Sequence, residues 1–333
     1  MKMLFFDFRE SEKEFFNNNN LTDFDIEFIK EPLNELSVLS EEQLEQTDVI
    51  SVFISSNVTE NVIKKFKNLR IITTRSTGYN HIDLKYCTQK NIAVFNVANY
   101  GESSVAQFTF MLILSLVRNL IPAYIDIQRS MVNHPSYEGR DINKLSIGIL
   151  GCGSIGASVA KIADFFGMQV YVCSYEKNKE ISNFAQYVSV DEMLAKSDII
   201  SLHLPYSAET HHIINEESFS KMKDGVYIIN TARGELLDIV ALYNNLLSGH
   251  VKGAALDVVE CENVAVSNNP LCEDSSNCVA KALIIQKLLS RPDVIITPHI
   301  AYNTKESVET ILKTTFNSIR DFSKGLHTNQ LRG

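Results

Sequence analysis

The sequence lacks any apolar run long enough to cross a lipid bilayer. Its most apolar stretch, residues 105–117, contains Gln107 and is shorter than the roughly 20 residues that a membrane-spanning helix needs, so we predict a buried helix there. A secretory signal is lacking as well, because Asp7 and Arg9 interrupt the short apolar run at the N-terminus. We therefore expect a cytoplasmic protein that does not bind membranes.

The sequence has fewer positively charged than negatively charged residues. The 31 Lys and Arg residues are outnumbered by 40 Asp and Glu residues, which leaves a net charge of −9. This balance argues against nucleic acid or an anionic membrane as a partner, because both attract proteins through clustered positive charge. A small anionic substrate is not excluded, since one arginine can dominate the electrostatics of a small pocket.

Cysteine pairs with the spacing of a metal site or a redox motif are missing too. The six cysteines lie at positions 87, 152, 173, 261, 272 and 278, and no two of them form a C-x-x-C pair. Cys152 and Cys173 occupy an expected turn and an expected strand, where cysteine usually acts as a small buried residue. Without a secretory signal we expect reduced thiols. The spacings of Cys261, Cys272 and Cys278 match no common ligand pattern, so we expect no metal.

The most informative stretch that the sequence does contain is residues 145–174. An apolar strand at 146–150 leads into Gly151-Cys152-Gly153-Ser154-Ile155-Gly156, and a helix at 157–167 and a second strand at 169–173 follow. This succession within about thirty residues is typical of a dinucleotide-binding unit. Gly151 permits the tight turn, Gly153 lets the backbone approach a pyrophosphate, and Gly156 lets the helix pack closely on the strand. The helix N-terminus then offers N–H groups to the phosphates.

Strands and helices alternate along the whole chain, which predicts an α/β fold with two domains. Residues 1–98 contain expected strands at 4–6, 25–29, 49–54, 70–73 and 92–95, and an expected helix at 60–67. A long helix from 102 to 120 ends before Pro122 and leads into the second domain, whose later strands lie at 199–203, 226–230, 253–258 and 294–297. A helix at 304–322 closes the chain.

Polar residues follow several of these strands. His203 ends one strand, Arg233 follows another, Asp257 ends a third, and His299 ends the last. Because ligands bind beyond the carboxyl ends of parallel strands, we expect these side chains to converge as an acid–base site with an anion clamp, although any one of them alone would more often be structural. The loop at 75–83 can also offer N–H groups to an anion, but its composition by itself favours a plain surface turn.

Several motifs together resemble the D-isomer-specific 2-hydroxyacid dehydrogenases, and within that family the D-lactate dehydrogenases, including the vancomycin-resistance type. The resemblance covers nearly the whole chain, and its motifs occur in the family's order: Thr77-Gly78, the turn at 151–156, Asn230-Thr231-Ala232-Arg233-Gly234, Ala255-Leu256-Asp257-Val258 and Thr297-Pro298-His299. The loop at 75–83, residues 295–302 and the long insert between Glu262 and His299 are similar to the D-lactate branch. The resemblance implies a central Rossmann-type NAD(P)-binding domain, residues 99–299, and a discontinuous flavodoxin-like substrate domain, residues 1–98 and 300–333. It also implies a homodimer formed through the nucleotide domain.

The resemblance implies roles for the candidate catalytic residues. Arg233 would bind the carboxylate and carbonyl groups of a 2-oxo acid and polarise the carbonyl for hydride attack. His299 would donate a proton to the substrate oxygen during reduction or accept one during oxidation. Glu262 would orient His299 and stabilise its imidazolium. Glu260 competes for this last role, but its spacing from Arg233 fits the family pattern less well than that of Glu262.

The remaining implied contacts concern the substrate and the cofactor. Main-chain N–H groups of Thr77 and Gly78 would hold the substrate carboxylate, which now outweighs a plain surface turn, and Tyr100 would lie near the substrate side chain. Asp257 would hold the nicotinamide carboxamide. The other implied cofactor contacts are Gly151, Gly153, Ser154, Ile155, Gly156, Ser174, Leu204, Pro205, Thr210, Thr231 and Ala232.

One departure from the family pattern concerns the choice of cofactor. NAD-using members end their second nucleotide strand in Asp, whereas this chain has Ser174 at that place, followed by Tyr175 and Glu176 before Lys177 and Lys179. A serine hydroxyl can bond to the ribose but does not repel a 2′-phosphate. We therefore predict NAD as the cofactor, with NADP tolerated.

The predicted activity is the reduction of pyruvate or a similar 2-oxo acid. Two alternatives stay open. One is a dehydrogenase for another small acid, such as formate or a bulkier 2-hydroxy acid; the other is a nucleotide-sensing binding protein, since some relatives act as transcriptional corepressors. The presence of Arg233, Glu262 and His299 together argues against a purely binding role, because binding alone needs no proton relay.

Overall fold

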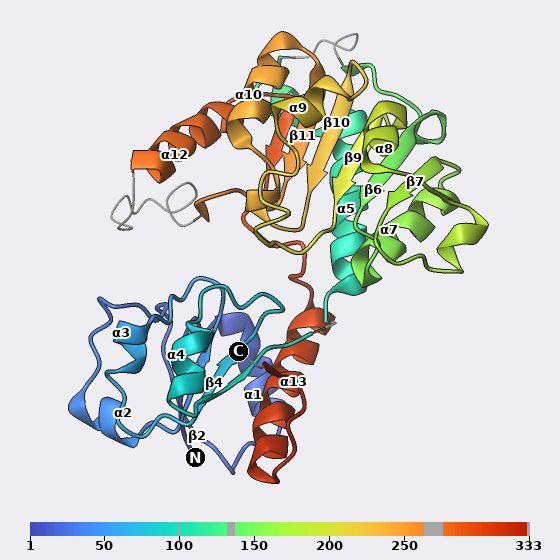
Figure 1. Cartoon of the computed structure of the whole chain (residues 1–333). Coiled ribbons are helices and arrows are strands. Elements are labelled where there is room, and N and C mark those ends of the chain that lie inside the picture. The colour runs from blue at the N-terminus through green and yellow to red at the C-terminus, as the bar shows by residue number, and fades with distance from the viewer. Residues whose placement is uncertain (99, 132–136, 263–275, 332–333) are drawn as a thin grey trace. The chain divides into compact units, whose positions relative to one another are not determined.

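The chain forms two compact units, each with its own parallel sheet. The computed structural model describes residues 1–98, 100–131, 137–262 and 276–331. A smaller unit consists of Met1–Tyr100 and Asn303–Gly333, and a larger unit of Gly101–Tyr302 (Figure 1). The two crossings, after Tyr100 and after Tyr302, lie close to the boundaries at 98 and 299 that the sequence predicts.

The smaller unit is built on a sheet of six strands in the order β13-β5-β4-β3-β1-β2. All neighbouring strands are parallel except β13, which pairs antiparallel to β5. The parallel strands thus follow the flavodoxin-like order 2-1-3-4-5, as predicted. The strands are β1 (Lys2–Phe5), β2 (Asp25–Phe28), β3 (Val49–Val52), β4 (Ile71–Thr74), β5 (Ala93–Phe95) and β13 (Gln330–Leu331). The helices are α1 (Lys13–Asn18), α2 (Glu41–Gln46), α3 (Glu60–Ile63), α4 (Leu84–Gln89) and α13 (Lys305–Ser323).

A buried arginine stabilises the middle of this sheet. The guanidinium of Arg75, directly after β4, donates to Ser51 Oγ (2.9 Å) and to the carbonyl oxygen of Phe6 (2.7 Å). It also lies 3.9 Å from the ring centroid of Phe5, a cation–π contact. Arg75 therefore joins the ends of β1, β3 and β4 and belongs to the core of this unit.

The larger unit contains a sheet of seven parallel strands in the order β12-β11-β10-β9-β6-β7-β8. Numbered within the unit this is 3-2-1-4-5-6 with one added strand, the Rossmann order, and the predicted fold class is confirmed. The strands are β6 (Ser146–Leu150), β7 (Gln169–Cys173), β8 (Gln186–Tyr187), β9 (Ile199–Leu202), β10 (Val226–Asn230), β11 (Val251–Leu256) and β12 (Val294–Ile296). The helices are α5 (Glu102–Val117), α6 (Leu120–Gln128), α7 (Ser154–Phe165), α8 (Val190–Lys196), α9 (Glu216–Ser220), α10 (Ile239–Ser248) and α12 (Ser276–Leu289).

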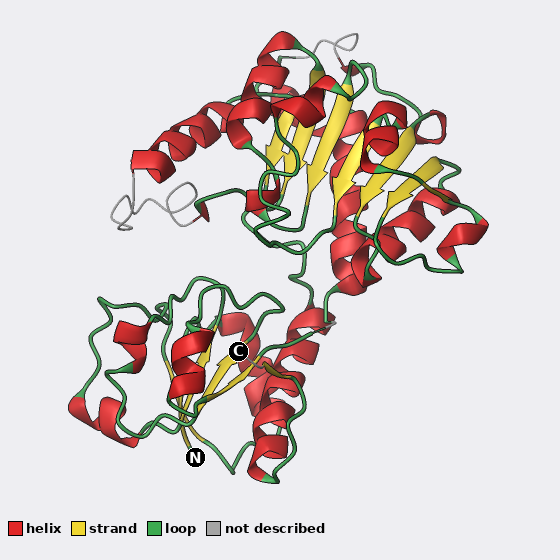
Figure 2. Ribbon diagram, in the orientation of Figure 1, coloured by secondary structure: helices red, strands yellow, loops and turns green. Residues whose placement is uncertain are grey.

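Helices cover both faces of the larger sheet (Figure 2). Helices α5 and α7 bury apolar side chains such as Ile113 and Val159 on one face, while α8, α9, α10 and α12 cover the other face. Helix α10 shows how local sequence sets these bounds. It begins after Asp238, whose carboxylate accepts hydrogen bonds from the N–H groups of Val240 and Ala241, and it ends at Gly249, which has a φ of 81°.

The predicted long helix is two helices. Helix α5 ends at Val117, Asn119 has a left-handed φ of 51°, and α6 starts at Leu120. Pro122 lies in the first turn of α6, where the N–H that proline lacks would have no partner within the helix. The prediction that the helix ends before Pro122 is therefore correct for α5, but the segment after it is helical as well.

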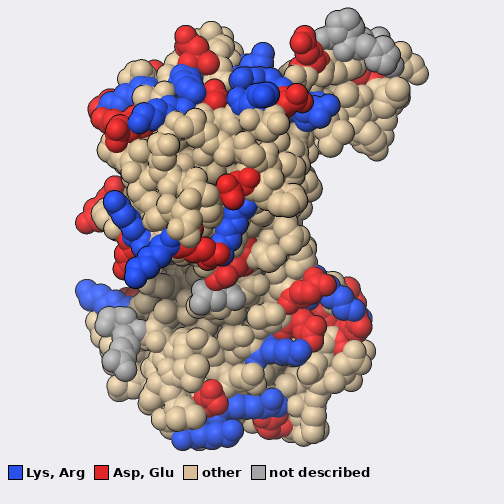
Figure 3. All heavy atoms as spheres, turned by 90° about the vertical axis from the view of Figure 1, so that its right-hand side faces the viewer, with Lys and Arg blue, Asp and Glu red and all other residues tan. Residues whose placement is uncertain are grey.

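Two further observations bear on the sequence predictions. No single helix in the described residues is long and apolar enough to cross a membrane, although α5 and α6, bent by 65° at their junction, pass that test as a pair. On the face shown in Figure 3, positively and negatively charged side chains are interspersed.

The prediction of reduced thiols differs from the structure at one place. Cys261 and Cys278 form a disulfide with a Cα–Cα distance of 5.7 Å, whereas Cys87, Cys152 and Cys173 are free. Cys272 lies outside the described residues. The bond was not predictable from spacing, because the pairing depends on where α12 packs relative to the segment after β11.

Candidate active site

Three glycines shape the turn between β6 and α7. Gly151 has a φ of +94°, which L residues rarely adopt, and a Cβ there would lie 2.8 Å from the carbonyl carbon of His203. A Cβ on Gly156 would lie 2.1 Å from the carbonyl oxygen of Gly151. Gly153 borders open space and is the N-cap of α7, where no side chain caps the helix. The first N–H groups of α7, beginning at Ser154, can therefore bind an anionic group.

The end of β7 lies directly beside this turn. Strands β6 and β7 pair Leu150 with Cys173, and the N–H of Gly151 donates to the carbonyl oxygen of Cys173 at 2.8 Å. Ser174 follows and is half-buried, whereas the side chain of Tyr175 is 96% exposed. A hydroxyl thus occupies the position next to the turn where a carboxylate would favour NAD over NADP.

The loop after β10 carries Arg233 and is held in shape by hydrogen bonds of its own side chains. The side-chain amide of Asn230 donates to the carbonyl oxygen of Arg233 (2.8 Å), and its oxygen accepts from the N–H of Ala232 (3.0 Å). Thr231 forms a hydroxyl–hydroxyl bond of 2.9 Å with Thr109 of α5. The guanidinium of Arg233 donates to the carbonyl oxygen of Ala232 at 2.6 Å and forms no ion pair with a carboxylate of the described residues. Its charge is therefore available to an anionic ligand.

Asp257 organises the loop that carries His299. Its carboxylate is 1% exposed and accepts hydrogen bonds from the hydroxyl of Thr297 (2.5 Å) and from the N–H groups of Ile300 (2.9 Å) and Ala301 (2.8 Å). His299, with a left-handed φ of 53°, donates its own N–H to the carbonyl oxygen of Asp257 at 2.9 Å. One buried carboxylate thus holds an unfavourable backbone conformation in place.

Glu262 and His299 face each other at the edge of this loop. The Nδ1 atom of His299 lies 3.0 Å from Oε2 of Glu262, and the other oxygen of Glu262 accepts from the N–H of Val259 at 3.3 Å. Because a carboxylate can only accept, Nδ1 carries the hydrogen of this contact. The Nε2 atom of His299 has no hydrogen-bond partner in the part of the chain that the structure describes. It is therefore the atom that can exchange a proton with a ligand.

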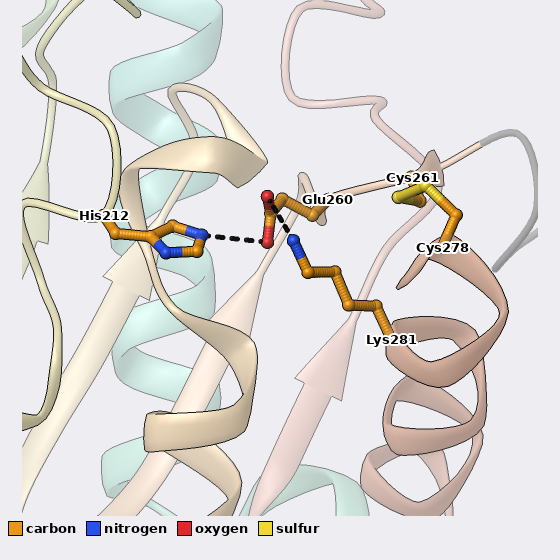
Figure 4. The surroundings of a disulfide bond; sticks show 5 residues. All are labelled: His212, Glu260, Cys261, Cys278 and Lys281. Carbon is orange, nitrogen blue, oxygen red and sulfur yellow. Dashed lines mark hydrogen bonds and ion pairs between the residues drawn. A yellow bond between two sulfur atoms is a disulfide. The ribbon is translucent and has the colours of Figure 1, made fainter. Parts of the chain in front are cut away.

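Glu260, the other candidate partner, belongs to a different cluster (Figure 4). Its carboxylate is 3.1 Å from Nε2 of His212 and 2.8 Å from Nζ of Lys281. The ligand atoms of His211, His212 and Glu260 lie within 4.8 Å of one another, which is a possible grouping for a metal ion. The ammonium of Lys281 already neutralises Glu260, however, and it opposes a second cation at that carboxylate.

The loop after β4 in the smaller unit exposes main-chain donors. Thr77 is exposed and Gly78 is half-buried, and neither N–H has an acceptor among the described residues. The Thr77 hydroxyl donates to the carbonyl oxygen of Val97 (3.0 Å), and the amide of Asn96 donates to the carbonyl oxygen of Thr77 (2.8 Å). The loop is thus held in shape while these two N–H groups stay without an acceptor among the described residues. Tyr100 is half-buried at the end of the same unit.

Comparisons with known proteins place the chain in one family. The family model for the D-isomer specific 2-hydroxyacid dehydrogenase NAD binding domain matches residues 110–301. The chain belongs to the D-isomer-specific 2-hydroxyacid dehydrogenase family. It is 35% identical to 2-hydroxyacid dehydrogenase homolog 1 of Schizosaccharomyces pombe over 97% of its own length and 96% of that protein. It is also 35% identical to an aromatic 2-oxoacid reductase of Clostridium sporogenes over 85% of each protein.

A solved structure agrees with this assignment. The D-lactate dehydrogenase from Aquifex aeolicus, complexed with NAD and lactic acid, matches with a TM-score of 0.87 and 37% identity over 99% of both chains. The predicted family is thus confirmed, and this dehydrogenase is an oxidoreductase that uses NAD. The β6–α7 turn fits that cofactor, because side chains at positions 151 and 156 would clash with nearby backbone and the N-terminus of α7, which no side chain caps, can accept a phosphate group.

The larger unit brings most of the predicted site residues to the carboxyl ends of its strands. Leu204, Pro205 and Thr210 follow β9, and the Thr210 hydroxyl donates to the carbonyl oxygen of Pro205 at 2.9 Å. Arg233 follows β10, and His299 follows β12. The buried carboxylate of Asp257 accepts hydrogen bonds from three donors of its own chain, and its role as a nicotinamide ligand stays a prediction.

Sequence reasoning missed the residues that hold the segment leading into Glu262. His212 and Lys281, which fix Glu260, follow no strand, and neither belongs to a recognisable motif. Cys261 directly precedes Glu262 in the sequence, and this position was the one available sign that the Cys261 thiol affects a candidate catalytic residue. The pairing with Cys278 requires the position of α12, which local sequence does not reveal.

His203 gives the fold a predictable dependence on pH. Its Nε2 atom is 2.8 Å from the Ser201 hydroxyl beneath the glycine turn, and burial lowers the pKa of His203 to about 4 from 6.5. The unfolded chain therefore takes up this proton first as the pH falls, so the contribution of neutral His203 to stability is lost between about pH 6.5 and pH 4. Full desolvation of the His203 imidazole would contribute at most about 3 kcal/mol to the free energy of unfolding. We expect about 2 kcal/mol, because the His203 side chain keeps some contact with solvent.

Urea unfolding at pH 7 and pH 4.5 measures this contribution. The free energy of unfolding of the wild type should fall by about 2 kcal/mol more over this range than that of His203→Gln, which has no group to protonate. An equal fall in both proteins would show that His203 is not buried as a neutral imidazole.

Proposed function

We propose that this dehydrogenase reduces pyruvate, or a 2-oxo acid of similar size, to the D-2-hydroxy acid. The observation that carries the proposal is the contact of 3.0 Å between Nδ1 of His299 and the carboxylate of Glu262, which leaves Nε2 of His299 as the proton-exchanging atom. A proton at that atom is what the reduction of a carbonyl group requires, and a protein that only binds its ligand needs none.

In this proposal Arg233 binds the substrate and His299 exchanges a proton with it. Bound NADH supplies the hydride. The guanidinium of Arg233 binds the substrate carboxylate and the adjacent carbonyl oxygen, and its charge stabilises the negative charge that develops on that oxygen. His299 delivers the proton from Nε2 to the same oxygen, while the charge of Glu262 stabilises the imidazolium before transfer. In the reverse direction His299 accepts the hydroxyl proton.

The other predicted residues complete the proposal. Thr77 and Gly78 bind the substrate carboxylate through the N–H groups that have no acceptor in the described residues, and Tyr100 contacts the substrate side chain. On the cofactor side, the turn from Gly151 to Gly156 binds the pyrophosphate. The remaining proposed cofactor contacts are Ser174, Leu204, Pro205, Thr210, Thr231, Ala232 and Asp257.

The test is a panel of 2-oxo acids assayed through the loss of NADH fluorescence. Pyruvate should be reduced, and chiral analysis should find the D-hydroxy acid. Phenylpyruvate and 2-oxobutyrate belong in the panel because one similar protein is named an aromatic 2-oxoacid reductase. Formate with NAD tests the remaining small-acid alternative. Binding of NADH without consumption by any acid of the panel would refute the proposed activity and favour a nucleotide-sensing role.

Ser174 leads to a prediction about cofactor choice. We expect the wild type to use both cofactors, with a preference for NADH of at most roughly tenfold, about 1.4 kcal/mol, because no carboxylate stands at the end of β7 to repel a 2′-phosphate. Ser174→Asp restores that carboxylate and should lower kcat/KM with NADPH much more than with NADH. The measurement compares both cofactors in both proteins.

The charged residues that follow Ser174 also bear on the choice between NADH and NADPH. Glu176 is exposed, and the ammonium of Lys177 lies 5.8 Å from the ring centroid of Tyr187, so that lysine is drawn toward β8. If the wild type already rejects NADPH by more than roughly a thousandfold, about 4 kcal/mol, another residue supplies the acid and the assignment of Ser174 is wrong.

We also propose that the dehydrogenase forms a homodimer through its larger unit. An apolar surface along α6 supports this, because Leu120, Tyr124 and Ile127 each expose more than half of their area. A monomer rarely leaves such neighbouring apolar side chains in water. We expect sedimentation to give twice the chain mass of 37.5 kDa, and Ile127→Glu should shift the protein toward monomer. A wild type that sediments as a monomer would contradict the proposal.

A further inference from the structure

The segment that leads into Glu262 is tied twice to helix α12. Cys261 forms a disulfide with Cys278 of this helix, and Glu260 forms an ion pair of 2.8 Å with Lys281. Cys278 and Lys281 are three residues apart and therefore lie on the same face of α12. Figure 4 shows both ties, with the two residues of each pair pointing toward one another.

The first part of α12 depends on these ties more than the rest of the helix does. Ile285 and Leu288, in its later turns, are fully buried in the core of the larger unit. Val279 and Leu283, in contrast, are 52% and 62% exposed. Opening the disulfide should therefore release Cys261 and the first turn of α12, while Lys281 stays paired with Glu260 and the end of the helix stays packed.

The backbone at Cys261 makes the orientation of Glu262 sensitive to that bond. Cys261 has a φ of 56°, in the left-handed region that residues with a Cβ rarely adopt. On its N-terminal side the chain is fixed, because a Cβ on Gly234 would lie 2.1 Å from the carbonyl carbon of Val259 and Glu260 is held by His212 and Lys281. When Cys261 is released and its φ relaxes, the turn therefore moves Glu262 rather than the preceding residues.

We propose that the Cys261–Cys278 disulfide is a thiol-responsive site that holds Glu262 against His299. The inference rests on the proposed roles of these two residues. A dithiol reductant opens the site in two steps: one thiolate attacks a sulfur of the disulfide and displaces the other cysteine, and the second thiol of the reductant then displaces the remaining cysteine. Two electrons pass to the protein, which gains two thiols, and the reductant leaves as a cyclic disulfide.

The open form has a defined kinetic signature. When Glu262 leaves Nδ1 of His299, the protonated imidazole loses the negative charge beside it. Reduction of a 2-oxo acid needs that proton, and the alkaline limb of the rate profile therefore moves to lower pH. The neighbouring charges stay in place, because the contacts of Glu260 with His212 and Lys281 do not involve the disulfide. KM for NADH should not change.

The experiment compares the air-oxidised protein with the same protein treated with dithiothreitol. Alkylation followed by peptide mass spectrometry establishes the state of Cys261 and Cys278. The rate of pyruvate reduction is recorded from pH 6 to pH 10, and the titration of the His299 imidazole is followed by NMR, with His299→Asn for assignment. We expect reduction of the disulfide to move both curves to lower pH and to lower the rate above the limb by roughly three- to tenfold.

Three variants control the comparison. Cys278→Ser should behave like the reduced wild type and should not respond to dithiothreitol. Cys87→Ala removes a thiol from the smaller unit and should respond like the wild type, since burial raises the pKa of the Cys87 thiol to about 12 and makes it a poor nucleophile. Glu262→Gln marks the end point, because its limb should already lie at lower pH in the oxidised protein and should not move further.

The two readouts separate failure of this inference from failure of the proposed function. Unmoved pH curves in a protein whose disulfide is verified as open would refute the inference, as would thiols that stay unpaired in the air-oxidised protein. If pyruvate and the other 2-oxo acids are not reduced at all, the proposed function fails, and the NMR titration still decides whether the disulfide controls the contact between Glu262 and His299.

Discussion

Replacing Arg233 with lysine is expected to lower kcat/KM for pyruvate by about a thousandfold, or about 4 kcal/mol, through a higher KM and a lower kcat. Lysine keeps the positive charge but loses the planar pair of donors that can bind a carboxylate and a neighbouring carbonyl oxygen together. Both polar groups of the Asn230 side chain hold the loop around Arg233 in place. The backbone therefore cannot shift to compensate for the donors that lysine lacks. Affinity for NADH should stay near that of the wild type.

Steady-state kinetics and NADH binding by fluorescence measure this effect, and Arg118→Lys serves as the matched control. Arg118 is an exposed arginine at the end of α5, so the same chemical change there should leave the kinetics unaltered. Wild-type kinetics in Arg233→Lys would remove Arg233 from the site. A large loss of NADH affinity would show instead that the loop after β10 has been disturbed as a whole.

Asp257→Asn should be the second severe change, with a loss of kcat of about a hundredfold, or about 3 kcal/mol. The carboxylate accepts from one hydroxyl and two N–H groups. An amide has only one oxygen, so its own NH₂ group would face a donor and leave buried groups unpaired, which costs about 1–3 kcal/mol of stability. The loop would lose the support for the left-handed backbone of His299, and the proton-exchanging atom would be misplaced.

Stability and kinetics together distinguish two roles of Asp257. If it organises the loop, urea unfolding and kcat should change together, and Thr297→Val, which removes one of the three donors, should have the same effect on a smaller scale. If it binds the nicotinamide carboxamide directly, the dissociation constant for NADH should rise while stability stays unchanged. Asp293→Asn is the control, because that carboxylate pairs with Arg291 at the partly exposed start of β12.

The features that sequence predicted well are those in which neighbouring residues determine the geometry. The turn from Gly151 to Gly156 is one, because Gly156 is required by a close contact within the turn and Gly151 by a positive φ and a close contact with His203 after β9. The order of strands and helices is another, since alternating apolar segments with short connections leave few topologies for a parallel sheet. The placement of Arg233 and His299 at strand ends followed from the same reasoning, and the family resemblance supplied their proposed roles.

The choice between Glu260 and Glu262 shows where local sequence stops being informative. The two carboxylates are two residues apart, and both follow β11. Glu260 contacts His212, which precedes it by 48 residues, and Lys281, which follows it by 21 residues. Glu262 is left to face His299. Spacing favoured the same residue, but the physical reason for the choice lies in these distant partners.

The sequence by itself determined the two α/β units, the nucleotide turn and the chemical types of the candidate site residues, because periodicity, glycine spacing and strand-end position are local properties of a chain. Tertiary structure alone decided that Asp257 is buried beneath the His299 loop, that α6 continues after Asn119, and that Cys261 meets Cys278. Each of these depends on which surfaces pack together, and burial, hydrogen-bond partners and disulfide pairing are set by neighbours in space rather than by neighbours in sequence.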